Sequence, residues 1–299
     1  MASFFDEIAR NRAKSVILML LFGLLFAGVI YAFVILLGGG IFGFLVGIII
    51  IIAYAAFSYH LGYKMVLKFS GAKEADKSQY SSLYSMIEGL SAAAAIPMPK
   101  VYIIQDPNPN AFATGRNKKT SAIAVTSGLL STMDRDELTG VLAHETSHIA
   151  NNDIQFMTIA VIFAGVIGLI AAYARMMFFF GPSFRNNNEN GGIILLIVLA
   201  IGLLAPLFAM LIRLSISRKR EYMADANGAR MTRAPMFLAN ALKKIQAYQK
   251  SPKPAPVKRA NEVTAPMYFA NPLSVKNISN LFSTHPPIED RIKKLEEMY

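Results

Sequence analysis

The chain has 299 residues, of which 54% are hydrophobic, and carries a formal net charge of +11. This apolar fraction is typical of a membrane protein rather than of a soluble one. The absence of cysteine excludes disulfides and thiolate metal ligands, so nitrogen and oxygen atoms would have to hold any metal. The basic charge is not accompanied by a nucleic-acid-binding module, and we predict no nucleic-acid partner.

Four uncharged apolar segments are long enough to cross a lipid bilayer. No charged residue occurs from Ser15 to Tyr59, and the glycines at 38–40 offer a tight turn near the middle of this stretch. A span needs roughly 20 apolar residues, which globular domains rarely place in one row, so membrane spans are favoured over buried core helices. We predict spans at residues 15–37, 41–59, 154–174 and 191–212.

The basic residues beside these segments predict the orientation of the chain. They precede the first segment and follow the second and the fourth: Arg10, Arg12, Lys14, Lys64, Lys68, Arg213, Arg218, Lys219 and Arg220. Cytoplasmic loops are enriched in lysine and arginine, so the N-terminus, region 63–153 and the C-terminal third are expected in the cytoplasm. There these residues would meet anionic lipid head groups of the bilayer. A transporter or channel would need ionisable residues inside the spans, and the four segments have none.

Outside the apolar segments, the sequence predicts helices around a small sheet. Apolar spacing and β-branched runs predict helices over 77–95, over 236–248 and from 286 onward, and strands at 101–104 and 121–126. The proline-rich polar stretch 251–271 is expected to be a long loop or a cover over the site. Peptide-cleaving sites often bind their substrate as an added strand of such a sheet.

A helix after these strands carries two histidines and a glutamate at HExxH spacing. Thr132 is expected to cap this helix, and apolar residues at helical spacing continue to Ile149. His144 and His148 share one face, and zinc requires neutral imidazoles that converge from one side. Glu145 lies beside the first histidine, where it could take a proton from a metal-bound water. The pentapeptide alone also occurs by chance on solvated helices, but this chain has only four histidines in total.

Two histidines leave a catalytic zinc short of one protein ligand. Downstream, Glu221 and Asp225 are also four residues apart, so on a helix both carboxylates share a face. One of them could bind zinc while the other orients a ligand histidine through its free ring nitrogen. The alternative is a solvated helix face, on which two acids lie among basic residues.

These motifs together resemble the HtpX family of membrane-embedded zinc metalloproteases, which is related to the CAAX prenyl protease Ste24. The matching segments are 110–115, 144–148, 218–225 and 283–287, and with the predicted spans the resemblance covers nearly the whole chain. Thr146 and Ser147 are more polar than the usual interior of the motif, but the three functional positions are intact. The resemblance implies a mainly helical α+β fold, with a zincin-like metalloprotease domain and a small β-sheet packed on a bundle of about four transmembrane helices.

The resemblance also implies roles for individual residues. His144, His148 and Glu221 would bind one zinc ion per chain, and Glu145 would act as the general base and later as the acid. Asp225 would contact one of the zinc ligands without binding the zinc itself.

Further residues are implied at the edges of the site. His285 would stabilise the developing oxyanion, or would be a surface histidine at a helix start. The substrate-binding edge would consist of Asn110, Ala111, Phe112 and Ala113, or these residues would form an ordinary loop and strand. Three arginines near the motifs could contact the site, but contact with lipid or solvent is favoured for them: Arg218, Arg220 and Arg291.

The sequence therefore predicts a multi-pass endopeptidase of the bacterial cytoplasmic (inner) membrane. The resemblance alone implies membrane proteins as its substrates, cleaved in quality control. Its predicted parts are a two-span anchor (1–62), the HExxH part of the catalytic domain (63–153), the third and fourth spans (154–213) and the part with the third ligand (214–299). A prenyl-protein protease is an alternative, but four spans are too few for that family's large intramembrane chamber. A non-catalytic membrane scaffold would not need Glu145. The oligomeric state does not follow from the sequence.

Overall fold

The protein is known here from a computed structural model, which describes residues 17, 20, 24, 27, 40–155, 157–158, 218–251, 268–269 and 286–298. The chain divides into two compact units, and each unit is built from two separate segments. Met1–His60 and Ile159–Ser215 form one unit, and Leu61–Thr158 and Ile216–Tyr299 form the other. The second unit contains the sheet and the HExxH helix, so it is the unit that positions the candidate site.

Helix α2 (Gly40–Phe69) contains the second predicted span and continues past it into the second unit. Among the residues that the structure describes, no helix has both the length and the apolar character needed to cross a membrane. The first, third and fourth predicted spans lie almost entirely outside the described residues.

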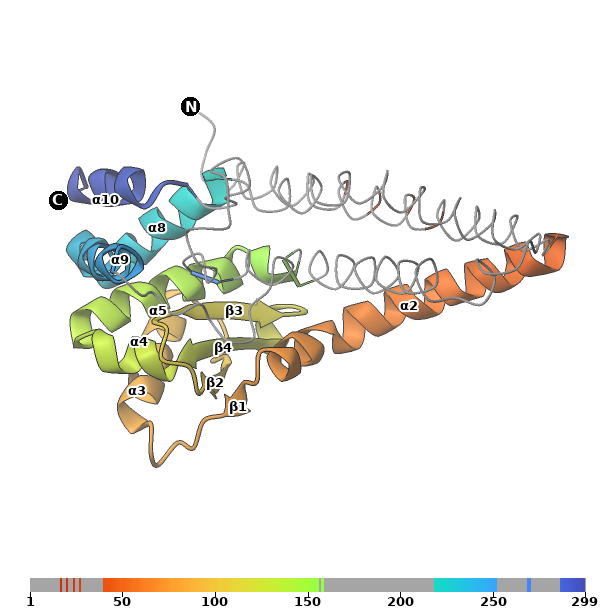
Figure 1. Ribbon diagram of the computed structural model, residues 1–299, viewed down its shortest axis with the longest axis horizontal. Helices are drawn as coiled ribbons and strands as arrows, with labels where there is room; N and C mark the ends of the chain where they lie inside the picture. The colour runs from red at the N-terminus through yellow and green to blue at the C-terminus, as the bar shows by residue number, and fades with distance from the viewer. Residues whose placement is uncertain are drawn as a thin grey trace, which may run out of the picture. The chain divides into compact units, whose positions relative to one another are not determined.

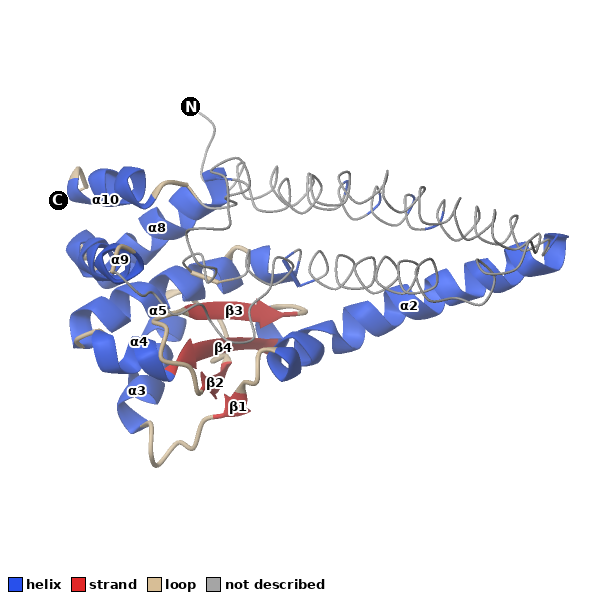
Figure 2. Cartoon of the chain, in the orientation of Figure 1, coloured by secondary structure: helices blue, strands red, loops and turns tan. Residues whose placement is uncertain are grey.

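The second unit contains a small mixed sheet of four strands (Figure 2). Their order is β1-β2-β4-β3, with β2 parallel to β4 and the two outer strands antiparallel to their neighbours. The strands are β1 (Lys73–Glu74), β2 (Lys100–Ile104), β3 (Ala111–Gly115) and β4 (Ser121–Thr126). The two strands predicted from β-branched runs are confirmed as β2 and β4. The sequence did not predict β1, because two charged residues carry no strand pattern.

Helix α5, which carries the HExxH motif, lies at the centre of this unit (Figure 1). It packs against α3, α8, α9 and β3. Its buried apolar residues join those of the sheet in one core. The remaining elements are α3 (Ser81–Ala93), a 3-10 turn at Lys118–Thr120, α4 (Ser127–Thr132), α5 (Arg135–Ala150), α8 (Arg218–Thr232), α9 (Pro235–Gln249) and α10 (Ile288–Glu296).

The start of α5 differs from the sequence prediction. Asp134, not Thr132, caps the helix: its carboxylate accepts from the Glu137 amide at 2.9 Å, and the Glu137 carboxylate accepts from the Asp134 amide at 2.9 Å. This reciprocal capping box satisfies two backbone donors at once, which a single threonine hydroxyl does not do. Thr132 instead ends α4, where its hydroxyl donates to the carbonyl of Gly128 at 2.7 Å.

Two glycines allow the helices beside α5 to approach it closely. A Cβ added at Gly140 would lie 2.5 Å from the backbone nitrogen of Leu238 on α9. On α8, a Cβ added at Gly228 would lie 3.2 Å from the backbone nitrogen of His144. Gly228 follows Glu221 by two helical turns, so the same face of α8 carries both residues. The close approach at Gly228 therefore brings the acidic face of α8 against the histidine face of α5.

Candidate metal centre

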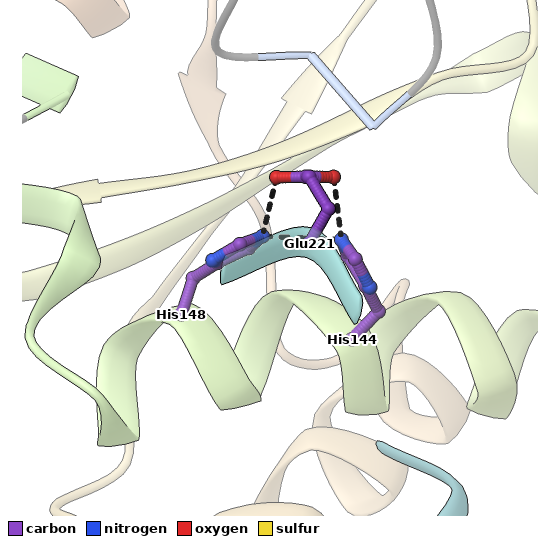
Figure 3. A group of neighbouring side chains, drawn as sticks. All are labelled: His144, His148 and Glu221. Atoms are coloured by element: carbon purple, nitrogen blue, oxygen red, sulfur yellow. Dashed lines mark hydrogen bonds and ion pairs between the residues drawn. The ribbon is translucent and has the colours of Figure 1, made fainter. Parts of the chain in front are cut away.

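The two HExxH histidines point their rings to the same side of α5 (Figure 3). Their Nε2 atoms are 3.1 Å apart, and their rings meet edge to face with centroids 4.7 Å apart. His144 is 1% exposed and His148 is 5% exposed, so bulk water does not solvate either ring. One turn of α5 thus presents two imidazole nitrogens to one buried point.

Helix α8 brings a carboxylate to the same point. Glu221 places Oε2 3.7 Å from Nε2 of His144 and Oε1 3.6 Å from Nε2 of His148 (Figure 3). One potential ligand atom from each of the three residues lies within 4.8 Å of the others. A tetrahedral zinc ion with ligands at about 2.0–2.2 Å separates its ligand atoms by roughly 3.3–3.6 Å. The three side chains therefore have a spacing that fits a zinc ion.

Behind the first histidine stands a second residue of α8, Asp225. Nδ1 of His144 lies 2.8 Å from Oδ1 of Asp225, and both side chains are buried. Arg291 on α10 donates to the same carboxylate from Nε and Nη2, at 2.9 Å and 2.7 Å. Burial alone would raise the pKa of Asp225, but the Arg291 charge and the hydrogen bonds from His144 and Arg291 outweigh it and hold that pKa below its usual value. Asp225 is therefore an ionised acceptor for His144.

The second histidine contacts Asp153 through its Nδ1, a partner that was not predicted from the sequence. Oδ2 of Asp153 lies 3.1 Å from Nδ1 of His148. A two-residue turn, Asn151 and Asn152, follows α5, and Asn152 adopts a left-handed conformation (φ 61°) that asparagine tolerates. Nη1 of Arg220 lies 3.9 Å from Oδ1 of Asp153. The sequence signal that could have indicated Asp153 is an acidic residue just beyond the end of the HExxH helix.

The two aspartates determine which ring nitrogens can bind a cation. Each accepts from an Nδ1–H, so in the neutral tautomers both Nε2 lone pairs face the same space. Burial lowers the pKa of His144 to about 4. Burial also lowers that of His148, but the Asp153 hydrogen bond and the charges of Glu221, Asp153 and Glu145 outweigh it and raise the pKa to about 9. The space between the two Nε2 atoms and Glu221 therefore favours a cation, either a proton on His148 or a metal ion.

Glu145 is buried beside this centre, with 2% of its surface exposed. Burial raises its pKa to about 7, and the Ala113 backbone amide, which donates to its carboxylate, partly opposes that rise. The acid and the base forms of Glu145 are therefore both accessible near neutral pH.

The predicted substrate edge lies on and next to β3, the outer strand that follows β4 in the sheet. Asn110, Ala111, Phe112 and Ala113 are all buried. The carbonyl of Ala111 accepts a hydrogen bond from the Phe269 amide at 2.8 Å. The Phe269 ring also meets the His144 ring edge to face, with centroids 5.0 Å apart. Phe269, which belongs to the predicted cover loop 251–271, thus lies between β3 and the histidines.

The structure corrects the expectation for two of the three arginines. Arg220 and Arg291 are 6% and 1% exposed and contact the site, so neither is solvated. Their partners, Asp153 and Asp225, are buried carboxylates, and a buried charge requires such a partner. Arg218 is exposed, as expected. His285 lies outside the described residues.

Comparison with known sequences agrees with this geometry. The sequence model of peptidase family M48 matches residues 77–299. The protease HtpX homologue of Dictyoglomus thermophilum is 44% identical over 296 residues, which cover 99% of this chain and 95% of the relative. The protease HtpX homologue of Thermodesulfovibrio yellowstonii is 45% identical over 276 residues, which cover 92% of this chain and 95% of the relative.

A solved structure shares the fold. The crystal structure of S. mikatae Ste24p matches with a TM-score of 0.52 and 20% sequence identity, and the match covers 96% of this chain and 67% of that one. At this identity the likeness concerns the fold, which is mainly helical with a small mixed sheet. The expected resemblance is confirmed by the family model and by the relatives of nearly equal length, and the chain belongs to peptidase family M48.

Proposed function

We propose that this peptidase is a membrane-anchored, zinc-dependent endopeptidase whose site faces the cytoplasm. One observation carries the proposal: two buried imidazole Nε2 atoms and the Glu221 carboxylate meet at one point, while aspartates occupy both Nδ1 atoms. Carboxylates on the far nitrogens of metal-binding histidines fix the tautomer and raise the basicity of the ligand. A pair of acids on a solvated helix face would have neither this burial nor these partners.

In this proposal His144, His148 and Glu221 hold one zinc ion. When bound, zinc supplies Lewis acidity, which polarises a scissile carbonyl and acidifies a water molecule. Glu145 accepts the proton of the attacking water and later delivers it to the leaving amine. The pKa of Glu145, raised by burial to about 7, suits both roles because the side chain can gain and lose a proton at neutral pH.

The substrate would bind along β3, with its backbone adding a strand at Asn110–Ala113 in the place where the Phe269 amide pairs with the Ala111 carbonyl. The Ala113 amide ties this strand to Glu145, which supports a substrate position beside the base. His285 is proposed to stabilise the oxyanion. Replacement of His285 by alanine should then lower kcat more than it raises KM, and an unchanged kcat would reject this role.

The membrane part of the proposal rests on the apolar segments of the chain. On α2, the apolar side chains of Phe42, Leu45, Ile49 and Ile52 are more than half exposed, which supports a lipid environment for this helix. We propose a two-span anchor at 1–62 and a second pair of spans at 154–213, which form a bundle in the inner membrane, with the catalytic parts 63–153 and 214–299 in the cytoplasm. Reporter fusions would test this orientation, and a periplasmic signal from a C-terminal fusion would contradict it.

The proposed substrates are membrane proteins, cleaved as part of quality control. A prenyl-protein substrate is the alternative, and the fold shared with Ste24p does not decide between them, because fold alone does not set specificity. Incubation of the full chain with an unfolded membrane protein and with a prenylated peptide separates the two.

The zinc peptidase proposal is tested with the full chain purified in detergent. It should contain about one zinc ion per chain by metal analysis and should cleave an unfolded model protein. Glu145→Gln should lower the cleavage rate by about 10²–10⁴-fold and leave the zinc content unchanged, because only the base is removed.

Glu88→Gln is the matched control, because Glu88 is an exposed glutamate on α3. This variant should cleave at the wild-type rate. A zinc-free wild-type chain, or full activity in Glu145→Gln, would overturn the proposal.

A further inference from the structure

One charged side chain of α10 reaches into the metal centre from outside the HExxH helix and outside α8. Arg291 is 1% exposed, although it belongs to a short helix whose other charged residues lie at the surface. A buried guanidinium is costly unless hydrogen-bonded acceptors compensate its charge. Its contacts therefore indicate what it does in the fold.

The guanidinium grips Asp225 at two points. Nε donates to Oδ2 at 2.9 Å and Nη2 donates to Oδ1 at 2.7 Å, which is the two-point geometry that arginine forms with a carboxylate. Oδ1 also accepts from Nδ1 of His144 at 2.8 Å. Nη2 and Nδ1 lie 3.4 Å apart, because both are donors that point to the same oxygen. Arg291 thus helps to fix the orientation of Asp225 and, through Asp225, the orientation of His144.

The position of Arg291 is itself fixed by contacts of α10 and Phe269. The guanidinium carbon lies 5.0 Å from the centroid of the Phe269 ring, and Nη1 lies 3.5 Å from the Phe269 carbonyl. Leu295, one turn along α10, is fully buried in the core. At the surface, Lys243 of α9 pairs with Glu296 of α10 at 2.7 Å. Docking of α10 therefore determines where the guanidinium lies.

We propose that Arg291 is a positioning residue of the metal centre: by clamping Asp225 it holds His144 with Nε2 toward Glu221 and His148, and it makes metal affinity depend on the docking of α10. Arg291 touches neither a substrate nor a reacting atom in this proposal. It acts mainly through Asp225, and its Nη1 also lies 3.9 Å from Oε2 of Glu221. The inference rests on the proposed zinc function and adds to it a residue and a helix that the three-ligand scheme does not include.

The test measures zinc affinity of the full chain in detergent by competition with a chromogenic chelator, which does not depend on catalysis. Arg291→Met removes both hydrogen bonds to Asp225 but keeps a side chain of similar length. Loss of an orienting partner behind a metal ligand typically costs about 10–100-fold in affinity, and we expect a zinc Kd raised by that factor. Arg291→Lys keeps the charge but lacks the planar guanidinium, so its zinc Kd should lie between that of the wild type and that of Arg291→Met.

Two comparisons separate positioning from a general loss of stability. Lys293→Met changes an exposed cation on the same helix and should leave the zinc Kd unchanged. In an Asp225→Asn background, Arg291→Met should weaken zinc binding much less than in the wild type, because the group through which it acts is already altered. A purely structural role would lower affinity by the same factor in both backgrounds.

The outcomes distinguish this inference from the proposed function. A wild-type chain that binds no zinc defeats the proposed function and this inference with it. A wild-type chain that binds zinc and cleaves protein, beside an Arg291→Met chain with the same zinc Kd, overturns this inference alone. If Arg291→Met does not fold, as judged by circular dichroism, Arg291→Lys decides: a folded Arg291→Lys chain with wild-type affinity also overturns it.

Discussion

The two histidines of the centre are held by the same chemistry but by different parts of the chain. His148 is held by Asp153, five residues further along, and Arg220 lies 3.9 Å from that aspartate. His144 is held by Asp225 of α8, which Arg291 of α10 clamps with two hydrogen bonds. We call these the local arm (His148, Asp153, Arg220) and the remote arm (His144, Asp225, Arg291).

In the local arm the histidine and its aspartate are five residues apart in the chain, whereas in the remote arm they come from two different helices. The local arm needs α5, the turn after it and one arginine of α8. The remote arm needs α8, α10 and Phe269 to be in place at once. Because a buried carboxylate without its cation is costly, the remote arm links metal binding to the packing of three elements. The two arms should therefore respond differently to mutation.

The largest effect is expected where the two arms meet, at Glu221. This carboxylate lies within 3.7 Å of Nε2 of both histidines, so Glu221→Ala removes the proposed third ligand that both arms share. We expect a fall in zinc affinity of at least about 100-fold and loss of peptidase activity. Metal analysis after dialysis measures this, and an unchanged zinc content would exclude Glu221 as a ligand.

The next effect compares the two aspartates directly. Asp225→Asn and Asp153→Asn should each weaken zinc binding by about 10–100-fold, because each histidine loses its anionic partner. Asp225→Asn should also destabilise the fold by about 3–5 kcal/mol, since Arg291 loses a carboxylate that it holds with two hydrogen bonds. Asp153→Asn should destabilise the fold less, since Arg220 lies 3.9 Å from Asp153, beyond hydrogen-bond distance. Thermal unfolding of the two variants measures this difference. Equal unfolding temperatures would show that the arms do not differ in their coupling to the fold.

A smaller effect concerns the pH dependence of zinc affinity, to which the two arms contribute differently. The pKa of His148 is raised to about 9 and that of His144 is lowered to about 4, so between these values the proton that competes with the metal belongs to the local arm. Zinc affinity should fall about tenfold per pH unit as the pH drops below about 9. Asp153 is a main cause of the raised pKa, so in Asp153→Asn this fall should begin at lower pH. Chelator competition from pH 6 to 9 measures both curves, and identical curves would contradict the assignment.

The smallest effect concerns the approach of α8 to α5. Gly228→Ala places a Cβ about 3.2 Å from the backbone nitrogen of His144, and we expect a destabilisation of about 1 kcal/mol with a modest loss of zinc affinity. Gly89→Ala on α3 is the control, because an added Cβ there meets nothing within 4 Å. It should be neutral or slightly stabilising, since alanine is the better helix former. A Gly228→Ala chain as stable as Gly89→Ala would show that the contact has room to relax.

The features that could be predicted from the sequence are those with a local signal. The i, i+4 spacing of the histidines and the helical stripe around them indicated a ligand pair, and the Glu221 and Asp225 pair indicated a shared face of α8. The start of α5 was misplaced by two residues, because Thr132 and Asp134 both carry capping chemistry and only the contact with Glu137 decides between them.

The remaining features depend on distant contacts. Arg291 lies three residues after Ile288 and four before Leu295, on the apolar face of α10, but this spacing does not show which group the guanidinium pairs with. The pairing with Asp225 arises from the packing of α10, which spacing along the chain does not encode. Asp153 was accessible in principle, yet its orientation depends on the left-handed turn at Asn152. The resemblance to a family supplied the proposed third ligand and a role for Asp225 beside a ligand, but it supplied neither Asp153 nor the pairing of Asp225 with Arg291.

The contact between Ala113 and Glu145 has a consequence for sequence variation. The donor to the glutamate is a main-chain amide of β3, so it is present whatever side chain occupies position 113. Exchange of alanine for another residue alters the volume there but leaves the donor intact, and proline alone among the common amino acids lacks it. The hydrogen bond to the base therefore depends on the backbone position of β3 and not on the identity of the side chain at position 113.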